Sequence, residues 1–298
     1  MNKLKRISKV FESAQEIPID DSSRIILMSD VHRGDGSWAD DFSKNQNLYF
    51  AALTHYYYEN YTYIEIGDGD ELWKNKRFSD IIYVHSNAFW LLSKFYDEGR
   101  LYMIFGNHDM VKSNAKFVDD TMNQYFDERE KKYIPLFKNI KLHEGLVLRH
   151  RVTDHKILLI HGHQVSFLDY ELWWLSRFLV RYLWRPLESF GVNDPTSTAK
   201  NYRKKDAVEK KLTEWVIQEK HMLIAGHTHK PMFPEVGCHP YFNDGSSIHP
   251  RSITAIEIAD GNIALVKWSV KTKDDGTLFI GRDVLAGPRK LTDYFYQY

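Results

Sequence analysis

Five short apolar segments, each followed at once by polar side chains, are the strongest constraint on how this 298-residue chain can fold. Each segment is four or five mainly apolar residues bounded by glycine or polar residues, which predicts a β-strand. The segments lie at residues 24–28, 63–66, 101–105, 156–160 and 222–225. Helical patterns near residues 45–57, 84–96 and 117–131 alternate with them. This alternation is typical of an α/β protein.

The C-terminal part of the chain predicts strands of the opposite direction. Residues 253–258 and 263–268 flank Asp260-Gly261, and this dipeptide between two apolar runs is a strong hairpin signal. A second turn is expected at Asp275-Gly276 before a final strand. The predicted sheet is therefore mixed rather than purely parallel.

The polar residues that follow the five strands are of the types that bind metals. They are Asp30 and His32, then Asp68, then Asn107 with His108 and Asp109, then His161, and finally His227 and His229. In α/β sheets, sites form at the carboxyl ends of strands. Independent surface loops would have no reason to carry such side chains at each of five strand ends. We therefore expect them to converge on one pocket.

The chemistry of these side chains suits a pair of divalent metal ions. Carboxylates, neutral imidazoles and an amide oxygen match Mn²⁺, Fe, Zn or Ni better than a thiolate site would. Asp68 is the best candidate for the carboxylate that bridges two cations. One metal would be completed by Asp30, His32 and His229, and the other by Asn107, His161 and His227. A water or hydroxide between two such ions becomes acidic, and the net positive site suits an anionic phosphoryl group.

These motifs resemble the signature of the calcineurin-like metallophosphoesterases, in order and in spacing, over most of the chain. The resemblance implies an α/β fold of the metallophosphoesterase type, a β-sandwich flanked by helices on both sides. It also implies the seven metal ligands assigned above. His108 is similar to the family's catalytic histidine, which stabilises the developing charge or protonates the leaving oxygen. Asp109 would orient an imidazole from outside the coordination shell.

A helical cap is predicted at about residues 165–218, between the fourth and fifth strands. Its first helical pattern places leucines on one face and Trp173, Arg177, Arg181 and Trp184 on the other. A second pattern covers residues 197–218 and is rich in lysine. The two helices could simply pack on each other with solvated charges. Alternatively, they could grip an amphiphilic anion or rest on a membrane surface.

A narrower resemblance supports a substrate-binding cap. The insertion is similar to that of UDP-2,3-diacylglucosamine pyrophosphohydrolases, manganese enzymes that cleave a pyrophosphate in a nucleotide-lipid at the membrane surface. The residues that this resemblance assigns to substrate are Asp169, Ser197, Asn201 and Lys204. His108 and His163 depart from it, because that family typically has Arg and Asp at these positions. Arg33, which flanks the first motif, is a further candidate for substrate contact.

Composition and the N-terminus place limits on partners and compartment. Lys plus Arg and Asp plus Glu each number 40, so no extended nucleic acid is expected as a partner. The single cysteine, Cys238, fits a reducing compartment. Residues 1–23 predict a helical extension without the apolar run of a secretory signal, ahead of a main domain at residues 24–298. We expect a cytoplasmic protein that could work at the inner face of the membrane.

The sequence therefore predicts a hydrolase that uses two divalent metal ions, preferably Mn²⁺, with Fe, Zn or Ni as alternatives. A hydroxide bridging the metals would attack a phosphodiester or pyrophosphate in a phosphorylated small molecule or a nucleotide-linked lipid or sugar. Three alternatives stay open: a nuclease or cyclic-nucleotide phosphodiesterase of the same superfamily, a non-catalytic scaffold, and a peripheral membrane module. The neutral charge balance argues against a nuclease, and the complete set of candidate ligands argues against a scaffold.

Overall fold

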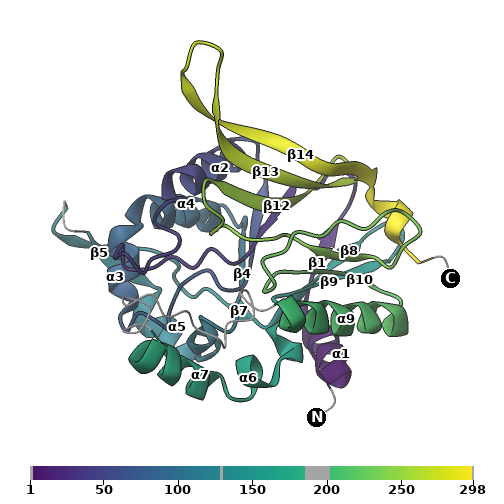
Figure 1. Cartoon of the computed structure of the whole chain (residues 1–298), viewed down its shortest axis with the longest axis horizontal. Coiled ribbons are helices and arrows are strands. Elements are labelled where there is room, and N and C mark those ends of the chain that lie inside the picture. Colours follow the sequence, from purple (N-terminus) through teal and green to yellow (C-terminus); the bar gives the residue numbers. More distant parts are fainter. Residues whose placement is uncertain (1–2, 128–129, 185–201, 297–298) are drawn as a thin grey trace.

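The computed structural model describes residues 3–127, 130–184 and 202–296. Two β-sheets pack face to face, with helices on both outer sides (Figure 1). The seven-stranded sheet has the order β14-β13-β12-β2-β3-β4-β7, and the five-stranded sheet has the order β1-β8-β9-β10-β11. This architecture confirms the predicted metallophosphoesterase-type sandwich.

The strands of the seven-stranded sheet are β2 (Ile25–Met28), β3 (Thr62–Ile66), β4 (Leu101–Ile104), β7 (Leu142–His143), β12 (Ser252–Ala259), β13 (Asn262–Thr272) and β14 (Leu278–Lys290). The first four are parallel to one another, and the last three join them as an antiparallel meander. The hairpin signals at Asp260-Gly261 and Asp275-Gly276 are confirmed, because β13 pairs with both β12 and β14. In Figure 1 the end of the β13–β14 hairpin projects beyond the body of the molecule.

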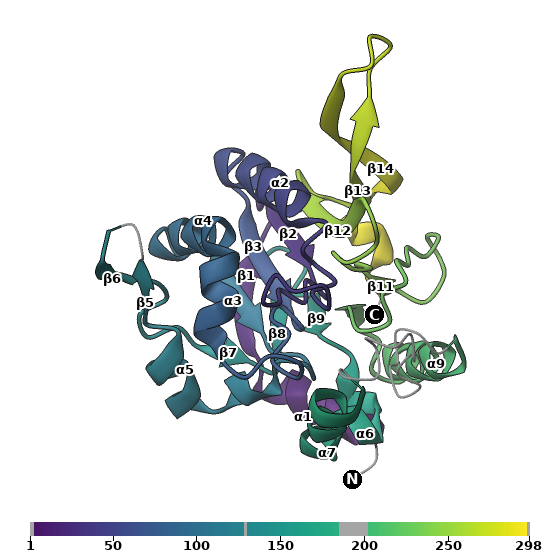
Figure 2. The same cartoon turned by 60° about the vertical axis from the view of Figure 1, so that its left-hand side comes forward.

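The strands of the five-stranded sheet are β1 (Gln15–Ile19), β8 (Gly145–His150), β9 (Lys156–Ile160), β10 (Met222–Ala225) and β11 (Tyr241–Asn243). Strands β9, β10 and β11 are parallel, whereas β8 runs antiparallel to β9. A separate hairpin, β5 (Gln124–Asp127) with β6 (Lys132–Pro135), extends away from both sheets (Figure 2). The predicted helix at residues 117–131 is therefore wrong beyond its first turns, since α5 (Ala115–Thr121) ends before this hairpin begins.

The apolar strands are buried on both faces, which explains why they read as continuous apolar runs. In β2, Leu27 points into the core between the sheets, whereas Ile26 and Met28 point to the helices outside. That outer layer consists of α2 (Gln46–Tyr58), α3 (Phe78–Val84) and α4 (Ser86–Asp97). The alternation follows from the two-residue period of a strand.

The other outer layer covers the five-stranded sheet and corrects two expectations. It consists of α1 (Lys3–Ser13) and α9 (Tyr202–Glu219). The N-terminal segment is not purely helical, because β1 pairs in parallel with β8 and completes the sheet edge. The cap is shorter than predicted, because Leu212 and Trp215 of α9 lie in the core against the sheet.

The described part of the cap is α6 (Phe167–Tyr170), α7 (Trp173–Leu179) and a π-helical turn, η3 (Val180–Trp184). Short 3₁₀ turns lie at η1 (Met110–Ser113), η2 (His163–Val165) and η4 (Leu291–Tyr294). Figure 2 shows α6 and α7 at the same end of the molecule as α1 and α9. Over the described ranges, none of the helices combines the length and apolar character needed to cross a membrane.

The packing of α9 can be tested with Trp215→Ala. The indole is fully buried, so its removal should lower the free energy of unfolding by about 3–5 kcal/mol. Ile217→Ala is the matched control on the same helix, because Ile217 is 47% exposed and should change stability by about 0.5 kcal/mol or less. Urea denaturation measures both. Equal effects of the two substitutions would show that α9 does not pack as described.

Candidate metal centre

The ends of the five ligand-bearing strands meet at one edge of the sandwich. Within the seven-stranded sheet, Asp30 N donates to Gly67 O at 3.1 Å. Within the five-stranded sheet, Gly226 N donates to His161 O at 3.0 Å. The two sheets are joined by Asp30 itself, because its Oδ2 accepts a hydrogen bond from His227 N at 2.8 Å. Residues almost two hundred positions apart in the chain thus share one pocket.

Among the described residues, three groups of candidate ligands form there, each with its ligand atoms within 4.8 Å of one another. Two consist of predicted ligands: the first group is Asp30, His32 and His229, and the second is Asp68, His161 and His227. The third is His32, Glu71 and His108. In the first group, Asp30 Oδ1 lies 2.9 Å from His229 Nε2. In the second, Asp68 Oδ2 lies 3.1 Å from His161 Nε2. The groups adjoin, since His161 Nε2 is also 3.9 Å from Asp30 Oδ1.

Five buried polar atoms of this pocket have no hydrogen-bond partner among the described residues. The buried unpaired atoms at the site are Asp30 Oδ1, His32 Nε2, Asn107 Oδ1, His161 Nε2 and His227 Nε2. A buried polar atom without a partner normally costs about 1–3 kcal/mol, so five in one place need an explanation. Divalent cations supply it, because each of these atoms is a good ligand for such an ion. The residues present therefore fit a metal centre.

The backbone at the site is strained in a consistent way. Five of the candidate ligands have left-handed φ angles between 50° and 68°, and these are Asp30, His32, Asp68, His227 and His229. Residues with a side chain rarely adopt this conformation, and such strain gathers at functional sites. It turns each side chain sharply away from its strand direction and towards the shared edge.

Two glycines allow the loops to approach closely enough. A Cβ atom at Gly106 would overlap the carboxylate of Asp68, and one at Gly226 would overlap Ser29 and the carboxylate of Asp30. Any side chain at these positions would displace a candidate ligand. The glycines that bounded the predicted strands are thus required by close contact.

Comparison with known proteins identifies the family. Residues 23–231 match the calcineurin-like phosphoesterase family. The chain belongs to this family. Its members are generally metal-dependent phosphoester hydrolases with a dinuclear metal centre, which agrees with the two ligand groups found here.

No curated protein matches the chain in sequence. Among solved structures, Vps29 of Chaetomium thermophilum is similar over 89% of this chain and 97% of its own, with 11% sequence identity and a TM-score of 0.41. The family match does not distinguish the narrower resemblance to UDP-2,3-diacylglucosamine pyrophosphohydrolases, which stays a prediction.

Electrostatics in this calcineurin-like phosphoesterase site favour cation binding. Burial alone raises the pKa of Asp30, but the imidazoles of His229 and His161 hold that pKa well below its usual range. Burial lowers the pKa of His161, yet Asp68 and Asp30 raise it to about 9. A divalent cation binding here must therefore displace a proton from His161. His163 differs, because burial and its two imidazole neighbours keep its pKa well below normal.

His108 is held at the rim of the pocket by a carboxylate that the sequence did not single out. Its Nδ1 lies 2.8 Å from Glu71 Oε2, and its ring stacks on the indole of Trp73 with centroids 4.2 Å apart. Glu71 Oε2 is also 3.4 Å from His32 Nδ1. Glu71 follows Asp68 by three residues in the same loop, and this spacing is the one signal that pointed to it.

Two predicted roles change because the side chains are buried in an ion network. Asp109 does not orient an imidazole; it accepts from Lys112 Nζ at 2.7 Å and from Gly106 N at 2.7 Å. Arg33 is fully buried and donates to both Glu65 and Asp70. It has no exposed surface for a substrate, so the expectation of substrate contact is wrong. Both residues instead brace the loops that carry the ligands.

Of the four cap residues predicted to bind substrate, the structure describes Asp169 and Lys204. Asp169 Oδ2 lies 3.5 Å from His227 Nε2, so the start of the cap reaches the metal centre. Lys204 lies in the first turn of α9 and is half-buried. Ser197 and Asn201 lie outside the described residues. His163 is buried beside His161, and neither of its ring nitrogens has a hydrogen-bond partner within the described ranges.

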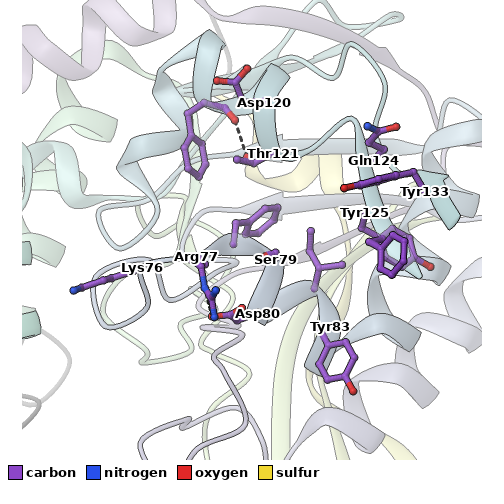
Figure 3. A pocket seen from close by; sticks show the side chains of 14 residues that line it. Lys76, Arg77, Ser79, Asp80, Tyr83, Asp120, Thr121, Gln124, Tyr125 and Tyr133 are labelled. Atoms are coloured by element: carbon purple, nitrogen blue, oxygen red, sulfur yellow. Dashed lines mark hydrogen bonds and ion pairs between the residues drawn. The ribbon is translucent and has the colours of Figure 1, made fainter. Parts of the chain in front are cut away.

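Two pockets lie away from the strand ends. One, of about 710 Å³, is formed by α3, α5 and the β5–β6 hairpin, and none of the predicted ligands line it. Figure 3 shows Tyr83, Tyr125 and Tyr133 gathered on one side of it and Lys76 with Arg77 on the other. A smaller pocket of about 410 Å³ lies between the cap and the loop after β3. Its basic lining side chains are Lys74, Lys76, Arg77 and Arg181, and its acidic ones are Asp35 and Asp80.

The metal assignment can be tested with Asp30→Asn. The amide oxygen can still accept from His227 N, but the amide nitrogen would then face the ligand group and repel a cation. We expect the wild-type chain to bind two Mn²⁺ ions and the variant to bind at most one tightly, as measured by calorimetry and metal analysis. Asp41→Asn, which removes an exposed carboxylate, is the control. Two tightly bound ions in Asp30→Asn would contradict the assignment.

Proposed function

We propose that this calcineurin-like phosphoesterase hydrolyses a phosphodiester or pyrophosphate bond in an amphiphilic substrate, with Mn²⁺ as the preferred metal. The observation that carries the proposal is the pair of adjoining ligand groups, in which four buried atoms have no hydrogen-bond partner among the described residues. The seven predicted ligands would hold the ions. When bound, two divalent cations supply an activated water and positive charge for the phosphoryl group.

His108 is the residue we assign to the leaving group. Because its Nδ1 is paired with Glu71, Nε2 is the nitrogen that can approach the substrate. Burial lowers the pKa of His108, but the carboxylates of Glu71 and Asp68 raise it overall. A protonated imidazole at this rim can donate to the oxygen that gains charge as the ester bond breaks.

The substrate's organic part is proposed to lie against the cap. The apolar side chains of α7 are exposed, with Trp174 at 58% and Phe178 at 56%, and no residue of this helix is fully buried. Basic side chains line the small pocket next to it. An amphiphilic anion complements both features, and a nucleotide-linked lipid is one such molecule. The cap would then also contact a membrane surface where that lipid resides.

We propose a class of substrate, and we do not assign to this chain the specific substrate of the UDP-2,3-diacylglucosamine pyrophosphohydrolases. His108 and His163 stand where that family typically has Arg and Asp. An imidazole can transfer a proton near neutral pH, whereas a guanidinium cannot. Such a change at the leaving-group position allows a different bond to be cleaved.

The reaction can be tested with Asp68→Asn and a panel of substrates. The panel should include phosphomonoesters, phosphodiesters, nucleotide sugars and CDP- or UDP-linked lipids, each assayed with added Mn²⁺. The variant keeps an oxygen that accepts from His108 N but loses the bridging charge, so kcat should fall at least about 100-fold. Circular dichroism should show an unchanged fold. Full turnover by Asp68→Asn would defeat the proposed function.

The role of the cap can be tested with the double substitution Trp174→Ser and Phe178→Ser. We expect KM for a lipid-linked substrate to rise about tenfold, while KM for a p-nitrophenyl ester changes little, because only the lipid needs the apolar face. The fraction of the protein that floats with lipid vesicles should also be lower for the double variant than for the wild type. The control is Trp90→Ser on α4, whose indole is 51% exposed and belongs to another face of the molecule. An active enzyme that turns over monoesters alone would remove the case for lipid selection.

A further inference from the structure

One arginine of the cap contacts the loop after β3, whose side chains pack against His108. Arg181 lies in the π-helical turn after α7, and its guanidinium donates to three backbone carbonyls of the turn that follows β3. Nε lies 2.9 Å from Trp73 O, and Nη2 lies 2.7 Å from Leu72 O and 2.9 Å from Asn75 O. A planar charged group that makes three such bonds fixes both the position and the orientation of this turn.

The same turn determines how the imidazole of His108 lies. Trp73 stacks on that ring at an interplanar angle of 21°, and Glu71 accepts from its Nδ1. The turn is closed by Glu71, whose Oε1 accepts from the backbone amides of Trp73 and Lys74, each at 3.1 Å. A displacement of the turn would therefore move two partners of His108 together, the indole of Trp73 and the carboxylate of Glu71.

We propose that Arg181 is a positioning residue through which the cap keeps His108 aligned for its role at the leaving group. The inference rests on the proposed function, because it requires His108 to act on the substrate. Arg181 also lines the pocket of about 410 Å³, so direct contact with the substrate is the competing explanation. The two explanations predict different kinetics.

The test compares Arg181→Gln and Arg181→Lys with Arg100→Gln. Arg100 is a matched control, because it also donates to backbone carbonyls, those of Tyr61 and Tyr57, ahead of β4 and away from the ligand-bearing strand ends. Arg181→Gln should lower kcat about 10- to 100-fold with KM nearly unchanged, and Arg181→Lys should fall between it and the wild type. The loss should be larger for alkyl esters than for p-nitrophenyl esters, because a poor leaving group depends more on proton donation. Arg100→Gln should keep the wild-type kcat.

A double-mutant cycle with His108→Asn separates positioning from substrate contact. If Arg181 acts through His108, the double variant should have the same kcat as His108→Asn alone. Losses that multiply would overturn the proposal. A raised KM with kcat retained would overturn it as well, and would assign Arg181 to the substrate.

Hydrogen exchange tests the contact without any assay of turnover. Arg181→Gln should speed exchange of the Trp73 and Lys74 amides, whereas Arg100→Gln should not. Unchanged exchange would overturn the proposal whatever the activity. If Asp68→Asn and His108→Asn keep full turnover, the proposed function fails. If those two variants are impaired and Arg181→Gln is fully active, the role of Arg181 alone fails.

Discussion

The carboxylate of Asp30 is the interaction on which the site depends. Its Oδ2 accepts from Ser29 Oγ at 2.5 Å and from His227 N at 2.8 Å, and the second bond joins the two sheets. Its Oδ1 is left to face His229 and the other candidate ligands. One side chain thus fixes the distance between the sheets at this edge and supplies negative charge to the pocket. A cation bound at Oδ1 would therefore depend on the hydrogen bond from His227 N to Oδ2, which also aligns the two sheets.

Beneath the ligands, a buried ion network keeps the loops in place. Arg33 pairs with Glu65 and Asp70, and Lys112 pairs with Asp70 and Asp109. Burying five charges is costly, and loss of one partner from such a network typically costs about 3–5 kcal/mol. The network connects the loops after β2, β3 and β4, which are the three loops that carry Asp30, Asp68 and Asn107. The loops after β2 and β3 contain residues with strained, left-handed φ angles, and the ion pairs of the network help to keep them in that conformation.

The sequence predicted those features that depend on local patterns of residues. It did not predict the roles of residues whose partners lie elsewhere in the folded chain. Apolar runs ending in Asp or His predicted the ligand-bearing strands, because both faces of each strand are buried and its end is a polar edge. The role of Asp109 was predicted wrongly, because Lys112 lies close enough to take its carboxylate only once η1 forms. Arg33 was predicted to contact substrate because it flanks the first motif, but Glu65 and Asp70, from distant parts of the chain, pair with it in the interior. Strand β1 was missed because Gln15–Ile19 has little apolar alternation and is completed by its pairing with β8.

The position of the cap in the chain explains how it can act on the site. It is inserted between β9 and β10, so in the chain it follows His161 and precedes α9 and the strand before His227. Its start is fixed by Arg6 of α1, which donates to Gln164 O at 2.7 Å and pairs with Glu171. After the cap, α9 returns the chain to the five-stranded sheet, where Trp215 is buried. The outer part, α7 with the turn that carries Arg181, contacts the other sheet's loop after β3. The cap therefore contacts elements of both sheets, and on the seven-stranded side it contacts the loop after β3, whose Glu71 and Trp73 pack against His108.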